Sequence, residues 1–129
     1  MRLRNIPGAK DAIGDSIYVI QEPQKNKGHW DQVFPKAQPI HLEVGMGKGR
    51  FLMDMARIHP EINYIGIEMY DSVLLRAIQK REALAEEGEI LSNLMFMRSI
   101  SSGGNHWLCR YNRRHDYRAG SCDGIFQTA

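Results

Sequence analysis

Three glycines at alternate positions and two acidic residues form the part of this sequence best suited to chemistry. Gly45, Gly47 and Gly49 follow shortly after Glu43, and Glu68 lies 23 residues after Gly45. Alternate glycines let a backbone turn sharply and approach a ligand, because no Cβ stands in the way. An acidic residue about 20 positions after such a loop is typical of a carboxylate that binds ribose hydroxyls. These five residues predict a binding site for a cofactor that contains a nucleoside.

Three short apolar segments, each predicted to be a strand, would position these residues. The first runs directly into the glycine loop, and the second carries Glu68 near its end. The predicted strands are residues 40–44 (IHLEV), 63–69 (NYIGIEM) and 94–97 (LMFM). A further short strand is predicted at residues 17–20 (IYVI).

Two helices are predicted between the strands, because apolar residues recur there at helical spacing. The first begins near Gly49 and ends before Pro60, and the second ends at Gly88. Asp71 or Ser72 is expected to cap the second helix, and its charged residues, Arg81 among them, are expected on a solvated face. Strands that alternate with helices predict an α/β fold with a parallel sheet.

The spacing within the loop favours one cofactor over others. Dinucleotide-binding loops place two residues between the second and third glycines, whereas this loop places one. Glu43 would repel a pyrophosphate but attract the ammonium group of S-adenosylmethionine, whose carboxylate could use the helix N-terminus. A triphosphate-binding loop is excluded, because no Ser or Thr follows Lys48. S-adenosylmethionine is the predicted cofactor, and a nicotinamide-dependent oxidoreductase is an alternative.

Several of these segments together resemble the bacterial tRNA (guanine-N7)-methyltransferases. The resemblance covers about residues 1–98 and is carried by residues 1–5 (MRLRN), 40–51 (IHLEVGMGKGRF), 63–69 (NYIGIEM) and 75–77 (LRA). It implies a Rossmann-like, S-adenosylmethionine-dependent methyltransferase fold with helices on both faces of the sheet. The implied reaction is methyl transfer to N7 of a variable-loop guanine in tRNA. It also implies that Glu43 and Glu68 contact the cofactor.

The last 31 residues depart from that family. The family has an aspartate where this chain has Ile100, and a later Asp-Pro-Trp-Pro motif that is absent here. We expect residues 1–36 to form an extended N-terminal arm, 37–98 the cofactor-binding half of a methyltransferase domain, and 99–129 a basic tail from a truncated or frameshifted reading. Because the acceptor-binding half is expected to be missing, a non-catalytic nucleoside- or RNA-binding fragment is the main alternative.

The length and composition of the chain exclude several other classes of protein. The chain has 129 residues, of which 43% are hydrophobic and 25% charged, which is typical of one modest globular domain. No apolar run approaches the roughly 20 residues that span a bilayer. Two cysteines are too few for a disulfide scaffold, so a cytoplasmic protein is expected. No metal site is expected, although the tail contains four zinc-capable side chains: His106, Cys109, His115 and Cys122.

Overall fold

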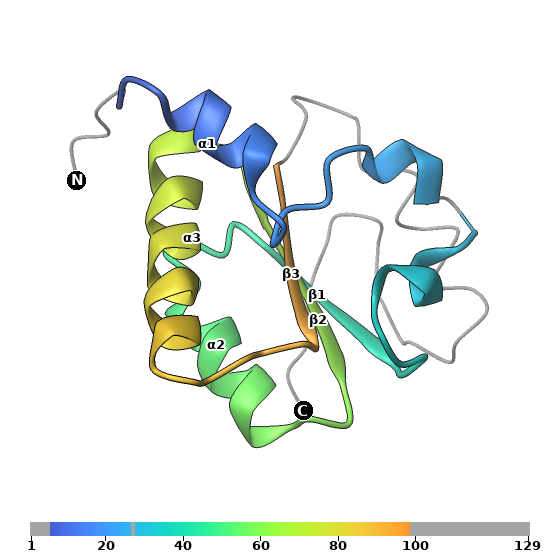
Figure 1. Ribbon diagram of the computed structural model, residues 1–129. Helices are drawn as coiled ribbons and strands as arrows, with labels where there is room; N and C mark the ends of the chain where they lie inside the picture. The colour runs from blue at the N-terminus through green and yellow to red at the C-terminus, as the bar shows by residue number, and fades with distance from the viewer. Residues whose placement is uncertain (1–5, 27, 99–129) are drawn as a thin grey trace.

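A computed structural model describes residues 6–26 and 28–98 of the chain, and it has the alternating order of strands and helices that the sequence predicts (Figure 1). The five alternating elements are β1 (Ile40–Val44), α2 (Arg50–Ile58), β2 (Asn63–Glu68), α3 (Asp71–Glu86) and β3 (Leu94–Arg98). They are preceded by α1 (Ala9–Asp15) and two short 3-10 helices, η1 (Pro23–Asn26) and η2 (Trp30–Val33). The α/β, Rossmann-like class is confirmed.

The three strands form one parallel sheet in the order β1-β2-β3. Glu43 pairs with Gly66 across β1 and β2, and Glu68 pairs with Arg98 across β2 and β3. Because all strands run in the same direction, their carboxyl ends meet at one edge of the sheet. The glycine loop and both predicted acids therefore lie at this carboxyl edge.

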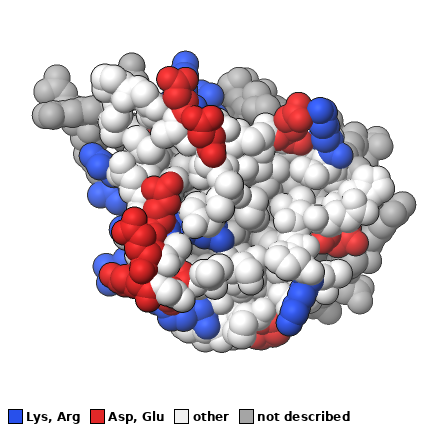
Figure 2. Space-filling view, viewed as in Figure 1, with Lys and Arg blue, Asp and Glu red and all other residues white. Residues whose placement is uncertain are grey.

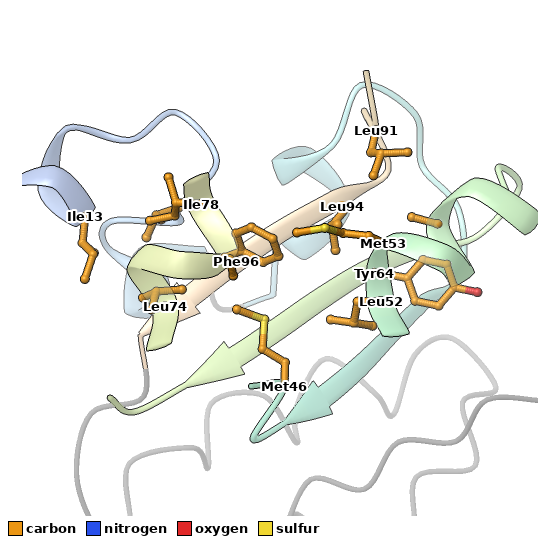
Figure 3. Close-up of a cluster of buried hydrophobic side chains, with 13 residues drawn as sticks. Ile13, Met46, Leu52, Met53, Tyr64, Leu74, Ile78, Leu91, Leu94 and Phe96 are labelled. Carbon is orange, nitrogen blue, oxygen red and sulfur yellow. The ribbon is translucent and has the colours of Figure 1, made fainter. Parts of the chain in front are cut away.

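The three α-helices lie on one side of the sheet in Figure 1, and the two 3-10 helices lie on the other. The side chains between the sheet and the α-helices form a buried cluster (Figure 3), which includes Leu52, Tyr64, Leu74 and Phe96. A second cluster covers the opposite face and includes Trp30, Phe34, Leu42, Ile65 and Ile67. Because both faces are covered, the central strand β2 is buried at all six positions.

The N-terminal segment is not the extended arm that the sequence predicts. It contains α1 and both 3-10 helices, and it adds to the free edge of β3 through one parallel bridge between Val19 and Phe96. Two backbone hydrogen bonds hold this bridge: Ile20 N–H donates to Phe96 at 2.9 Å, and Phe96 N–H donates to Tyr18 at 2.8 Å. The predicted strand at residues 17–20 is thus reduced to a single bridge. The reason is apolar burial, since Ile13, Val19, Ile20, Trp30 and Phe34 are all part of the core.

Arg81 is buried beneath this segment rather than solvated, which corrects the prediction for its face of α3. Only 4% of the residue is exposed, and its guanidinium donates hydrogen bonds to the carbonyl oxygens of Leu91 and Leu94. The guanidinium carbon lies 4.4 Å from the centroid of the Tyr18 ring, a cation–π contact. Burial lowers the pKa of Arg81 to about 10. Arg81 therefore joins α3 and the start of β3 to the N-terminal segment.

The ends of the two longer helices follow from local chemistry. Helix α2 begins after Gly49, and α3 ends in a Schellman motif in which Gly88 has a φ of 88°. In that motif Gly88 N–H donates to Ala85 at 3.0 Å and Glu89 N–H donates to Leu84 at 2.9 Å. The predicted cap of α3 is wrong, because Tyr70 occupies the cap position and its side chain makes no capping hydrogen bond.

The charged surface on the face shown in Figure 2 is mixed, with Lys and Arg side chains lying among Asp and Glu side chains. Within residues 6–26 and 28–98, none of the helices has the length and apolar character needed to cross a membrane. The basic tail and its zinc-capable residues lie outside the described residues.

Candidate cofactor site

The glycine loop lies across the end of β2 in a conformation that requires glycine. Gly45, Gly47 and Gly49 have φ values of 77°, 62° and 75°, a region that other residues rarely adopt. The N–H groups of Gly45 and Met46 donate to the carbonyl oxygen of Ile67 at 2.8 and 3.1 Å, which fixes the loop to β2. A Cβ built on Gly45 or Gly47 would meet no heavy atom of the described residues within 4 Å. The backbone at these two glycines therefore faces open space in which a ligand can approach.

Glu68 connects this loop to the segment that follows β2. Its Oε2 accepts a hydrogen bond from Gly47 N–H at 3.0 Å, and its Oε1 accepts from Met69 N–H at 2.9 Å and Tyr70 N–H at 3.1 Å. Only 6% of the residue is exposed. A carboxylate offers about four acceptor positions, so three backbone donors leave Oε2 able to accept one more hydrogen bond. Glu68 is thus held firmly and still has an acceptor available.

Glu43 lies on the same face of the sheet as Glu68. It is the register partner of Gly66, and paired residues of parallel strands point to the same side. Its Oε2 is buried and accepts no hydrogen bond within the described part of the chain. Burial raises the pKa of Glu43 above its ordinary value of 4.5. A buried carboxylate oxygen without a donor is costly, and a cationic ligand group would satisfy it.

Comparison with known proteins shows which family has a sequence that matches this part of the chain. The methyltransferase family model Methyltransf_4 matches residues 37–101, a range that contains the loop and both acids. This chain belongs to that methyltransferase family. The family resemblance inferred from the sequence is confirmed.

This chain has relatives whose names agree with one another. It is 54% identical over 98 residues to a tRNA (guanine-N(7)-)-methyltransferase of Lachnoclostridium phytofermentans, which covers 76% of this chain and 44% of that protein. It is 51% identical over 98 residues to the protein of the same name from Halalkalibacterium halodurans, covering 75% of this chain and 42% of that protein. The chain therefore spans less than half the length of these two relatives.

A solved structure gives a weaker likeness. The arsenic (III) S-adenosylmethionine methyltransferase CrArsM of Chlamydomonas reinhardtii matches with a TM-score of 0.41 and 22% identity, over 84% of this chain and 35% of that chain. A likeness of this size is too small to place the site residues of this chain.

The candidate site also depends on a residue that the sequence pattern does not single out. Gly66 lies in the middle of β2, beneath the glycine loop and the first turn of α2. A Cβ on Gly66 would lie 2.2 Å from Sδ of Met46 and 2.6 Å from Cδ1 of Leu52. The absence of a side chain at residue 66 therefore lets the loop residue Met46 pack onto the sheet. A glycine inside a strand is the sequence pattern that could have indicated this close approach.

Proposed function

We propose that residues 37–98 bind S-adenosylmethionine at the carboxyl edge of the sheet. The observation that carries this proposal is the joint position of Glu43, Glu68 and the open glycine backbone. Glu43 has a buried oxygen that an ammonium group would satisfy, and Glu68 has a free acceptor for a ribose hydroxyl. The N-terminus of α2 beside Gly49 would favour the ligand's carboxylate. An ammonium group, ribose hydroxyls and a carboxylate are three of the polar groups that S-adenosylmethionine presents.

We further propose that the whole enzyme transfers a methyl group to N7 of guanine in tRNA, as the names of the relatives say of those proteins. S-adenosylmethionine, when bound, supplies a methyl group on a positively charged sulfur. N7 of guanine carries a lone pair, so no residue has to remove a proton before transfer. The protein's task would be to align N7 with the methyl group, and such alignment can lower a barrier by roughly 7–11 kcal/mol.

The direct test is calorimetric titration of the chain with S-adenosylmethionine, NAD and tRNA in separate experiments. Binding of S-adenosylmethionine but not NAD is expected. Binding of NAD instead would favour an oxidoreductase, and binding of tRNA alone would favour a non-catalytic RNA-binding protein. Methylation of tRNA, assayed by aniline cleavage at the modified guanine, tests the second half of the proposal.

Replacing Glu68 by alanine is expected to weaken binding of S-adenosylmethionine by about 1.5–3 kcal/mol, because a hydrogen bond to a charged group is lost. Gly47→Val is also expected to weaken binding, since its methyl groups would enter the open space in front of the loop. Glu82→Ala is the matched control, because Glu82 is exposed on α3. Unchanged calorimetric affinity in both site variants would contradict the proposed site.

Binding of S-adenosylmethionine is expected to weaken as the pH is lowered through the raised pKa of Glu43. Only the ionised carboxylate attracts an ammonium group, and burial raises this pKa above 4.5, so protonation begins at a higher pH than for an exposed glutamate. Affinity should therefore be constant near neutral pH and fall on acidification. The variant Glu43→Gln should bind more weakly at neutral pH and show a flatter pH profile. An identical profile in this variant would assign the pH dependence to another group.

A further inference from the structure

Arg98 and Asp71 form an ion pair beside the predicted ribose carboxylate. Arg98 is the last residue of β3, and Asp71 is the first residue of α3. Nε of Arg98 lies 2.8 Å from Oδ1 of Asp71. The Asp71 side chain is 16% exposed and the Arg98 side chain is 48% exposed, so the carboxylate is the more fixed partner.

The sheet places Arg98 next to a different carboxylate. Arg98 is the register partner of Glu68, and neighbouring parallel strands are only about 4.8 Å apart. Paired residues also point to the same face, so both side chains leave the sheet on the side that α3 covers. In the described part of the chain, however, the ion pair of Arg98 is with Asp71 and not with Glu68.

A guanidinium on Glu68 would interfere with ribose binding. Three backbone N–H groups already use most of the acceptor positions of Glu68. Arginine donates in a fork that matches a carboxylate, so it would occupy the remaining position. It would also add a positive charge next to a ligand that itself carries a sulfonium.

We propose that Asp71 is a positioning residue that holds Arg98 away from Glu68 and so keeps one acceptor of Glu68 available for a ribose hydroxyl. This inference rests on the proposed binding of S-adenosylmethionine, and it concerns residues that act on Glu68 rather than on the ligand itself. It differs from a simple brace between α3 and β3. For a brace, loss of either partner has the same consequence, whereas here the harmful event is the release of Arg98.

The test compares Asp71→Asn, Arg98→Gln and the double variant by calorimetric titration with S-adenosylmethionine at constant pH and salt. Asp71→Asn is expected to weaken binding of S-adenosylmethionine about 10-fold, because the released Arg98 would take the acceptor of Glu68 from the ribose hydroxyl. A 10-fold loss is the usual effect of losing one hydrogen bond to a charged group. Arg98→Gln should bind within about 3-fold of the parent, because Glu68 then has no competing cation. The double variant should return to the affinity of Arg98→Gln. Equal losses in all three variants, or no loss in Asp71→Asn, would overturn the inference.

A second measurement separates this inference from the proposed function, because it needs no cofactor. Arg98→Gln is introduced into two background proteins, and the change in melting temperature is measured in each. The first background carries Asp71→Asn alone, and the second carries Asp71→Asn together with Glu68→Gln. If the released Arg98 forms an ion pair with Glu68, removal of Arg98 should lower the melting temperature by about 3 °C in the first background. In the second background Glu68 is already replaced, so removal of Arg98 should leave the melting temperature unchanged. Equal shifts in both backgrounds would overturn the inference even if the parent binds S-adenosylmethionine. A parent that binds no S-adenosylmethionine would instead overturn the proposed function.

Discussion

Replacing Gly66 by valine is expected to lower the free energy of unfolding by about 3 kcal/mol, because the added side chain overpacks a closed region of the core. Its Cβ alone would lie 2.2 Å from Sδ of Met46 and 2.6 Å from Cδ1 of Leu52. Both neighbours are buried, with 6% and 2% of their surface exposed, so neither can move into solvent easily. Urea unfolding followed by circular dichroism measures the change directly.

Gly14→Ala is the control for this experiment. Gly14 is an exposed residue of α1, and in the part of the chain that the structure describes a Cβ there would meet no heavy atom within 4 Å. Alanine is the better helix former, so this variant is expected to be slightly more stable than the parent, by about 0.5 kcal/mol. A Gly66→Val variant as stable as the parent would mean that Met46 and Leu52 repack freely. The glycine loop would then not depend on close contact with β2.

Replacing Asn93 by alanine is expected to lower the free energy of unfolding by about 3 kcal/mol, because several carbonyl oxygens lose a donor at once. Asn93 is buried just before β3, and its Nδ2 lies 3.0 Å from the carbonyl oxygen of Ala56, 3.1 Å from that of His59 and 2.8 Å from that of Ile62. These carbonyls belong to the end of α2 and the turn that leads into β2. Asn93 thus ties the helix end to the strand on which the site is built.

Two further variants test this account of Asn93. Asn93→Asp keeps the shape but replaces the donor with a carboxylate, so it should destabilise more at pH 7 than at about pH 4, where the protonated acid can donate. Ser92→Ala changes the exposed neighbouring residue and should leave the unfolding midpoint unchanged. An Asn93→Ala variant with the stability of the parent would show that water replaces the amide without loss.

The strands, helix ends and glycine turn that the sequence predicts correctly depend on residues close to one another in the chain. The strands at residues 40–44 and 63–69 (observed at 63–68), the helix start at Gly49 and the helix stop at Gly88 all follow from apolar spacing and from glycines with positive φ. The same holds for the glycine loop, whose three positive φ values agree with the prediction of a sharp turn. Its role in cofactor binding, like those of Glu43 and Glu68, stays a prediction.

The features that the sequence did not reveal depend on contacts between distant residues. The pairing of Arg98 with Asp71 is set by the register of β3 against β2, which no local pattern encodes. Arg81 has the helical spacing of the buried residues Leu74 and Ile78, but its charge predicts a solvated position. The ring of Tyr18 from the N-terminal segment and the ring of Phe96 from β3 cover it instead. The sequence predicts that the N-terminal segment is extended because prolines and glycines interrupt it, whereas its few buried apolar residues determine where it packs.

The packing of the N-terminal segment has a practical consequence for the choice of protein fragments. The match to the family model begins at residue 37, and a fragment designed by homology would naturally begin there. Such a fragment would lose Trp30 and Phe34 from one face of the sheet and would leave β3 without its bridge partner Val19. Bare sheet edges and exposed apolar faces favour aggregation. The smallest unit worth expressing therefore begins before α1, about thirty residues upstream of the boundary that the family model gives.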